Sequence, residues 1–508
     1  MHQLTLYCIL VISKVLVTKT LGIDLGGTGM RLKVVFSFLG VLLIFIGVSM
    51  IIPIITAVIY RDIDGIAFIV AMGFTIVVGQ VLRNLATGEE NLRHREGFAI
   101  VTLGWLLISV FGAIPFMLAD VFDNFVDAFF ESVSGFTTTG ATVIMSLESL
   151  SHTILMWRSL MHWLGGMGII VMSIVILPEL AGSMQLFKAE VPGPIHERLK
   201  PRIKETAKTL WVVYLILTVA QIIILCLQGM PLFDALIHSF GTISTGGFSS
   251  RTLSVKAYDS LAIDVIMALF MFLAGINLTL HYQVLTGRIK SLFTNQEFRF
   301  YTLIVVTAIA AITINLRLQV YKSVVDSFKY AAFQVTSIIS TAGFATVDYD
   351  IWPPFSRGIL LMLMFIGGCA GSTAGGIKVI RIYALMKKGF QELYKVIRPR
   401  AVTSLKIGNR AISEEVSTSI LGFFFLYIIV FVISTITLTS FGIDLISSIS
   451  AVAATLGNIG PGLGLIGPLN TYVPLPVVGK LLLSFCMILG RLEIYTVLVF
   501  LLSGFWRK

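Results

Sequence analysis

The chain has 508 residues, of which 56% are hydrophobic and only 13% are charged. Soluble domains carry about 25% charged residues, so this composition excludes an ordinary soluble protein and indicates a polytopic membrane protein. The net charge of +10 does not predict a nucleic-acid ligand, because the basic residues alternate along the chain in a way that fits membrane topology. The four cysteines lie far apart in apolar segments and predict neither a disulfide framework nor a metal site.

Residues 1–30 are predicted to be an N-terminal extension of uncertain origin. They contain GIDLGGTGMR, which resembles the first phosphate loop of sugar kinases in the actin-like ATPase superfamily. That loop works only inside a large two-lobed α/β domain, whereas this chain turns into a membrane helix by Val34. We therefore expect an upstream extension, with Met30 as the original start, rather than a kinase.

Apolar runs recur along the rest of the chain, and a run of about 20 residues is enough to cross the hydrocarbon core of a membrane. The predicted spans are Val34–Tyr60, Gly65–Leu82, Gly97–Leu118, Ile154–Leu177, Leu210–Leu227, Leu261–Leu280, Tyr301–Ile314, Gly358–Leu385, Ile420–Phe441 and Val477–Leu502. The run Tyr301–Ile314 is short and needs its flanks to span.

Lys and Arg residues concentrate in four of the connecting loops, which are Arg83–Glu96, Lys188–Lys208, Arg288–Arg299 and Lys378–Arg410. The stretches Ala141–Thr153 and Gly462–Val478 contain none. Because basic residues are enriched in cytoplasmic loops, we predict that these four loops and both termini face the cytoplasm.

Four segments between the predicted spans are too short and too polar to cross a membrane. Each begins with Asp, continues through apolar and small residues, and ends in Thr, Ser or Gly. In chain order they are DAFFESVSGFTTTGATV from Asp127, DALIHSFGTISTGGFS from Asp234, DSFKYAAFQVTSIISTAGFATV from Asp326 and DLISSISAVAATLGNIGPGLG from Asp444. Alignment of their ends places Gly140, Gly247, Gly343 and Gly460 in register, so the chain repeats a unit of span, half-helix, glycine turn and span.

Non-helical backbone at membrane depth is tolerated only where it lines a cavity or is buried in protein. Four glycine turns around an axis can direct rings of carbonyl oxygens at a dehydrated ion, and the half-helices direct their negative C-terminal ends to the same place. The alternative is a set of interfacial helices with ordinary glycine caps.

The acidic residues near these segments have two interpretations. We expect Asp127, Asp234, Asp326 and Asp444 to be N-caps of the half-helices. A vestibule that attracts cations is the second interpretation, and it applies above all to Glu131. The residues that flank the first two loops are Asp120, Asp123, Asp127, Glu131 and Asp234.

The four loops, the segment GGCAGSTAGGIK from Gly367 to Lys378 and the terminal GRLEIYT together resemble the Trk/Ktr/HKT superfamily of potassium transporters. The resemblance is closest to the bacterial TrkH-type subunits and extends from about Leu32 to Lys508. It implies an all-α polytopic membrane protein that forms a homodimer with one pore in each protomer. Two extra N-terminal transmembrane helices (31–96) precede four non-identical repeats of helix, pore helix, filter loop and helix, at 97–185, 205–290, 298–398 and 411–508.

The resemblance also implies a potassium-selective filter made of backbone carbonyls. The residues that match are Thr138, Thr139, Gly140, Thr245, Gly246, Gly247, Thr341, Ala342, Gly343, Asn458, Ile459 and Gly460. Some relatives that move sodium have Ser in place of the first-loop glycine, so Gly140 favours potassium. The loops lack TVGYG, and we expect milder discrimination than in tetrameric potassium channels.

The segment GGCAGSTAGGIK does not fit a nucleotide-binding P-loop, because Ile377 separates Gly376 from Lys378 and a membrane helix precedes it. Its glycines instead predict a break in the membrane helix, and the resemblance implies an intramembrane gate beneath the filter. The predicted gate residues are Gly367, Gly368, Gly371, Ser372, Thr373, Gly375, Gly376 and Arg491. The alternatives are tight helix packing for the glycines and an ion pair of Arg491 with Glu493 or another carboxylate. Arg158 and His162 are interpreted as packing or interface residues.

We therefore predict potassium uptake across the bacterial inner membrane through a gated pore that is driven by the membrane potential. Potassium is the transported ion, and we expect no organic cofactor and no enzymatic activity in this chain. Besides membrane lipid, the resemblance implies a cytosolic ring of Rossmann-type subunits that bind NAD and ATP or ADP. The alternative function is a sodium- or proton-coupled cation symporter.

Overall fold

The structure is a computed structural model that describes residues 32–84, 94–180, 199–399, 406–408, 410–502 and 505. The predicted N-terminal extension and residues 188–198 of the second basic loop lie outside this range. Within it, six helices are long and apolar enough to span a membrane, or up to eight if each of two bent helix pairs forms one span. The prediction of a polytopic all-α membrane protein is confirmed.

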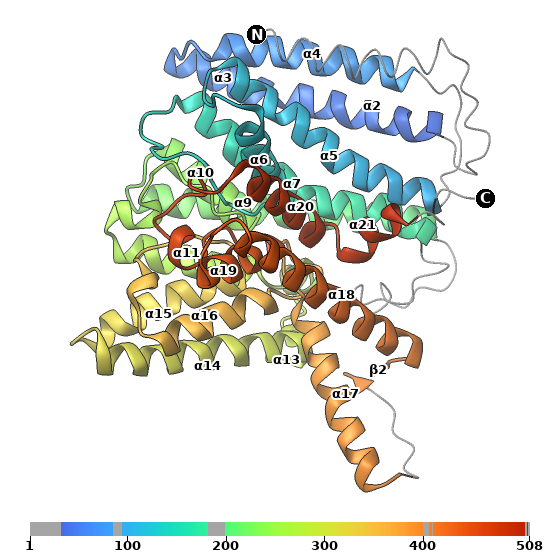
Figure 1. Ribbon diagram of the computed structural model, residues 1–508, viewed down its shortest axis with the longest axis vertical. Helices are drawn as coiled ribbons and strands as arrows, with labels where there is room; N and C mark the ends of the chain where they lie inside the picture. Colours follow the sequence, from blue (N-terminus) through green and yellow to red (C-terminus); the bar gives the residue numbers. More distant parts are fainter. Residues whose placement is uncertain are drawn as a thin grey trace.

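The first helices form a tight antiparallel pair. Helices α2 (Leu32–Ser49) and α3 (Ile51–Tyr60) lead into α4 (Gly65–Arg83), which packs along α2 at the top of Figure 1. Gly40 of α2 and Gly79 of α4 let the two backbones approach closely, because a Cβ at either position would lie within 3.0 Å of the other helix's backbone.

Four repeats follow, and each has a short helix between two longer segments. Repeat 1 consists of α5 (His94–Leu118), α6 (Phe125–Phe136) and α7 (His152–Leu180). Repeat 2 consists of α9 (Leu199–Leu227), α10 (Leu232–Ile243), α11 (Leu261–Ala274) and α12 (Leu278–Leu285). Repeat 3 consists of α14 (Gln296–Gln319), α15 (Val324–Ile339), α16 (Pro354–Ile366) and α17 (Val379–Ile397), and repeat 4 of α18 (Glu414–Thr439), α19 (Leu445–Leu456), α20 (Val477–Arg491) and α21 (Ile494–Leu501). The predicted short span at Tyr301–Ile314 is therefore the middle of the 24-residue helix α14.

Minor elements complete the connections. They are η1 (Ser254–Tyr258), α13 (Lys290–Thr294), η2 (Tyr349–Ile351), the hairpin of β1 (Lys406–Ile407) with β2 (Arg410–Ala411), and η3 (Gly464–Ile466).

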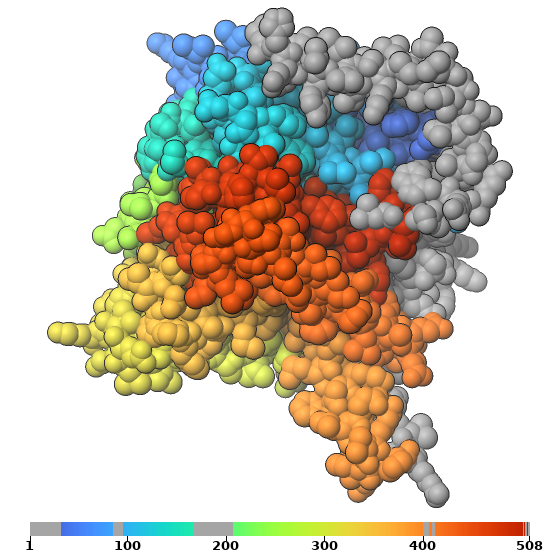
Figure 2. Space-filling model, viewed as in Figure 1, coloured from blue at the N-terminus to red at the C-terminus, as the bar shows by residue number. Residues whose placement is uncertain are grey.

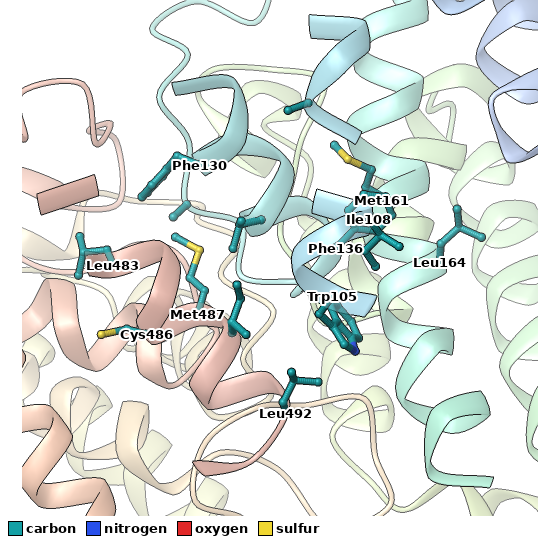
Figure 3. Close-up of a cluster of buried hydrophobic side chains, with 14 of the residues drawn as sticks. Trp105, Ile108, Phe130, Phe136, Met161, Leu164, Leu483, Cys486, Met487 and Leu492 are labelled. Carbon is teal, nitrogen blue, oxygen red and sulfur yellow. The ribbon is translucent and has the colours of Figure 1, made fainter. Parts of the chain in front are cut away.

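The last repeat packs against the first, so the four repeats close into a ring. Helix α20 of repeat 4 contacts the repeat-1 pore helix α6, and α21 contacts α5. The two repeats lie side by side in Figure 1 although they are far apart in the sequence. Figure 3 shows the buried cluster that joins them, in which Phe130 and Phe136 of α6 lie between side chains of α5, α7 and α20. This ring places the four filter loops around one axis.

The second membrane segments of repeats 2, 3 and 4 are broken. The predicted break in Gly358–Leu385 is confirmed, because α16 ends at Ile366 and α17 begins at Val379. Two runs that were predicted to be continuous, Leu261–Leu280 and Val477–Leu502, are instead bent by 104° and 116°. Glu493 has a left-handed backbone at the second of these bends, which a helix cannot accommodate. Helix α17 leaves the body as a projecting arm (Figure 2).

Candidate functional site

The four pore helices, α6, α10, α15 and α19, end in the same backbone geometry. In each repeat, the residue two positions before the filter glycine has a left-handed backbone with φ between 53° and 60°: Thr138, Thr245, Thr341 and Asn458. The next residue's N–H donates to the carbonyl five residues earlier at 2.7–2.9 Å, from Thr139 to Ser134, Gly246 to Gly241, Ala342 to Ser337 and Ile459 to Ala454. This is the Schellman helix end, which usually has glycine at the left-handed position. A β-branched Thr there is strained, and strain of this kind persists only where the surroundings fix it.

The filter glycines close a ring in which each loop touches the next. A Cβ on Gly140 would lie within 3.0 Å of the Gly246 carbonyl oxygen in repeat 2. The same relation continues from Gly247 to Ala342, from Gly343 to Ile459 and from Gly460 back to Thr139. All four glycines also have φ between 72° and 96°, where residues with a Cβ are strained. Each of these positions therefore requires glycine for two reasons, which are the positive φ and the close approach of the neighbouring carbonyl.

The loops supply neutral oxygen atoms at this ring. The carbonyls of Thr139, Gly246, Ala342 and Ile459 lie at the junctions between neighbouring loops. Rings of such oxygens can replace the hydration shell of a monovalent cation. The arrangement is thus chemically suited to holding a dehydrated ion.

The segments that follow the filter interlock as a second ring towards the predicted outer face. Backbone N–H groups donate across each junction between repeats: Thr252 to Glu148 (2.9 Å), Lys256 to Ala345 (3.2 Å), Gly464 to Asp350 (3.0 Å) and Tyr472 to Thr142 (2.8 Å). Burial raises the pKa of Glu148, but its hydrogen bonds from Thr252 outweigh this effect and leave the pKa below its ordinary value. The filter loops are therefore held together by these hydrogen bonds on their predicted outer side as well as by the contacts of their glycines.

The acidic residues occupy three different environments. Asp120 and Asp123 are exposed, whereas Asp127 is half-buried and pairs with Lys480 of repeat 4 at 2.6 Å. Asp234 is buried and pairs with Arg251. Glu131 is fully buried in an ion pair with Arg158. This placement corrects the expectation that Glu131 faces an open vestibule, because its carboxylate is saturated by protein donors.

Only one of the four expected Asp caps is a cap. Asp444 is the N-cap of α19 and accepts from the N–H of Ser447 at 3.0 Å. The N-caps of α6 and α15 are Asn124 and Ser323, and α10 follows Pro231. The other three Asp residues instead occupy the first turn of their helices, where a negative charge also stabilises the helix N-terminus.

Residues 367–378, which we call the intramembrane segment, lie directly beneath the filter. The Thr373 hydroxyl donates to the carbonyl of Ile243 at the end of α10, at 2.9 Å. The N–H of Gly375 donates to the hydroxyl of the filter residue Thr341 at 2.8 Å. A Cβ on Gly375 would lie within 3.0 Å of the Gly457 carbonyl of repeat 4. The segment therefore packs against the loops of three repeats, and its small residues allow that approach.

Repeat 2 and the first helix of repeat 3 hold the intramembrane segment from its remaining sides. At the break in repeat 2, Cys369 N–H donates to the Gly275 carbonyl at 2.8 Å, and Leu278 N–H donates to the Gly371 carbonyl at 3.0 Å. The buried carboxylate of Glu297 in α14 accepts from the N–H of Ala370 at 2.7 Å. Neither Glu297 nor the repeat-2 break was predicted from the sequence, although an ionisable residue at the edge of an apolar run is a usable signal.

Arg491 links the intramembrane segment to repeat 1. Its side chain is 4% exposed and donates to the carbonyls of Thr373 at 2.7 Å and Gly165 at 3.1 Å. The alternative pair with Glu493 is wrong, because Glu493 pairs with Arg381 of α17 at 2.8 Å. With the described residues, Arg491 makes hydrogen bonds to carbonyls but no ion pair. A buried positive charge thus lies next to the segment that packs beneath the filter.

Comparisons with known proteins agree with this architecture. The TrkH family, described as "Cation transport protein", matches residues 65–506. The "Trk system potassium uptake protein TrkH" of Salmonella typhimurium is 43% identical over 487 residues, covering 94% of this chain and 100% of that protein, and the protein of the same name from Escherichia coli (strain K12) has the same identity and coverage. The crystal structure of the potassium transporter TrkH from Vibrio parahaemolyticus superposes with a TM-score of 0.87 at 39% identity, covering 94% of this chain and 100% of that chain.

Proposed function

Because this chain belongs to the TrkH family of cation transport proteins, we propose that it takes up potassium across the bacterial inner membrane through the pore ringed by Gly140, Gly247, Gly343 and Gly460. The observation that carries the proposal is the closed contact of the four filter loops, each glycine against the next loop's carbonyl. The relatives named as potassium uptake proteins, at 43% identity, support potassium as the ion.

Permeation is passive in this proposal. The membrane potential supplies roughly 2.3 kcal/mol per charge per 100 mV, which is enough to drive uptake without a coupled reaction. The carbonyls of the predicted filter residues take over the coordination of the ion as it loses water. The inner end of this path is formed by the backbone carbonyls of the first filter residue in each loop: Thr138, Thr245, Thr341 and Asn458.

The intramembrane segment and Arg491 form the gate. The segment fills the space beneath the filter, and the guanidinium adds a positive charge that opposes a cation. Opening requires that the hydrogen bonds of Thr373, Gly375 and Arg491 to their neighbours be released.

Regulation comes from the cytosol in this proposal. Helix α17 continues directly from the intramembrane segment and projects from the body, so a partner that moves α17 can pull on the gate. We propose a ring of Rossmann-type subunits that bind NAD and ATP or ADP as this partner, and a homodimer with both termini in the cytoplasm. The Trk system named for the relatives is consistent with a multi-component assembly.

Flux measurements in proteoliposomes test the function. Purified protein with an imposed potential, and with equal pH and sodium on both sides, should take up the potassium tracer rubidium at a rate that follows the potential. Uptake that requires a sodium or proton gradient would instead establish the symporter and overturn passive permeation.

A further inference from the structure

One position behind the filter carries a polar side chain in three of the four repeats. Nine residues before the filter glycine the sequence has Glu131, His238, Gln334 and Ala451, all buried. Each polar member bonds the non-helical segment that leaves its own filter loop, which we call the filter strand. His238 contacts the Ser249 hydroxyl at 3.0 Å, and Gln334 donates to the Thr346 hydroxyl at 3.4 Å.

Repeat 4 makes the equivalent contact from the preceding position. The Ser450 hydroxyl bonds both the N–H and the carbonyl of Leu463 at 2.9 Å. Every pore helix therefore clamps the strand on the outer side of its filter glycine. Because the filter strand follows directly after the glycine, the clamp fixes how the filter carbonyls are aimed.

The repeat-1 clamp is charged and makes more contacts. The Glu131 carboxylate accepts from the Thr142 hydroxyl at 3.0 Å and from the N–H of Val143 at 3.0 Å. It also accepts from Nε of Arg158 at 2.8 Å, and the two side chains are 0% and 2% exposed. Glu131 is the only carboxylate among the four equivalent positions.

Arg158 extends this clamp to the next loop. Its guanidinium lies over the ring of Phe248 with 4.0 Å to the centroid, and Nη1 donates to the Ser249 carbonyl at 3.4 Å. Phe248 and Ser249 follow directly after Gly247. The chain of contacts therefore runs from the strand after Gly140 to the strand after Gly247, behind the junction where Gly140 meets the Gly246 carbonyl.

A buried ion pair of this kind is not explained by stability. Removing two charges from water costs about as much as their attraction returns, and replacing both members with apolar residues is often neutral for folding. Fixing a unique geometry is a role that buried polar and ionic groups have in some proteins. A pair that contacts two filter loops can fix their separation, which apolar packing defines less sharply.

We propose that Glu131 and Arg158 are a positioning pair that sets the spacing of filter loops 1 and 2 and thereby the discrimination between potassium and sodium. The proposal rests on the filter function proposed above. Neither residue contacts the ion, and both act through the strands that follow Gly140 and Gly247.

The test replaces both charges at once, because removal of one partner leaves an uncompensated buried charge that can unfold the protein. The double variant Glu131→Gln with Arg158→Met keeps an acceptor for Thr142 and Val143 and keeps the side-chain volumes close. We expect a folded protein whose ratio of potassium to sodium flux falls by about fivefold, equivalent to about 1 kcal/mol. The matched control is Asp264→Asn with Lys329→Met, which removes an ion pair between repeats 2 and 3 that does not contact the filter strands.

The outcomes separate this proposal from the filter proposal. An unchanged ratio in the folded double variant, with a changed ratio in Gly140→Ser, overturns the positioning role and leaves the filter intact. Unchanged ratios in both overturn the filter and the positioning role together. An equal loss of selectivity in the control pair overturns the specific role of Glu131 and Arg158. If the double variant does not fold, Arg158→Lys decides: it retains the charge but cannot reach Glu131, Phe248 and Ser249 together, so an unchanged ratio overturns the proposal.

Discussion

The filter ring and the layer beneath it come from the same four repeats, yet only the ring is symmetric. All four loops share the left-handed residue, the Schellman bond and the contact from glycine to the next carbonyl. The second membrane segments share no such pattern. They break over three residues in repeat 2, over twelve in repeat 3 and over two in repeat 4, whereas α7 of repeat 1 is a single helix.

The proposed function accounts for this difference. A ring of carbonyls surrounds an ion only if every repeat contributes the same backbone geometry. The proposed gate needs only one segment, because additional copies would collide on the axis. In that proposal the intramembrane segment of repeat 3 is the gate, and other repeats anchor it through residues such as Gly275 and Arg491.

The largest expected effect on the rate of uptake comes from shortening the intramembrane segment. Deletion of Gly371–Ala374 removes the part that bonds Ile243 and Arg491, so rubidium uptake in the absence of any partner should rise by about tenfold or more. The ratio of potassium to sodium flux serves as the control and should stay near the wild-type value, because the ring is intact. Unchanged uptake in a folded deletion variant would contradict the proposal that this segment is a gate.

Breaking the ring should change selectivity instead of rate. Gly140→Ser places a Cβ against the Gly246 carbonyl at a φ of 82°, which displaces the first loop. We expect the potassium-to-sodium ratio to fall by about tenfold.

Gly229→Ser is the matched control for this variant. Gly229 has a φ of 87° but nothing within 4 Å of a built Cβ. It carries the same backbone strain without the clash, so its selectivity should remain that of the wild type. An equal fall of the ratio in both variants would show that backbone strain, and not the contact with the Gly246 carbonyl, is responsible.

Substitution of Arg491 should raise uptake less than the deletion in the intramembrane segment. Arg491→Gln removes the buried charge and weakens the bonds to Thr373 and Gly165, so uptake without a partner should rise by about threefold. Arg491→Lys keeps the charge but cannot donate to both carbonyls in the same way. If the lysine variant behaves like wild type, the charge is the barrier; if it behaves like glutamine, the hydrogen bonds are. Wild-type uptake in both variants would exclude Arg491 from the gate.

The smallest effect concerns strain at the helix ends. Thr138→Gly relieves a left-handed β-branched residue and should stabilise the purified protein by about 1 kcal/mol, measured by thermal unfolding in detergent. The same change at Thr341 should gain less, because Thr341 also accepts the hydrogen bond from Gly375. A destabilised Thr138→Gly protein would contradict the assignment of strain.

Several features followed from the sequence because they depend on local composition. Each apolar run is long enough to cross a membrane as a helix, and a run of glycines such as Gly367–Gly376 cannot continue a helix, so the apolar segments and the break in repeat 3 were predictable. The bends in repeats 2 and 4 were not. The register of Gly140, Gly247, Gly343 and Gly460 was also visible, because a positive φ next to a carbonyl leaves no alternative residue.

Tertiary structure decided which charges meet. Glu493 was the nearest carboxylate to Arg491 along the chain, but the bend after Arg491 turns Glu493 towards Arg381 of another repeat. Glu131 was interpreted as a vestibule residue and Arg158 as a packing residue, and only the packing of α6 against α7 within repeat 1 brings the two charges together behind the filter. Pairing energy depends on distance in space and on burial, and neither is encoded by the spacing of residues along a helix.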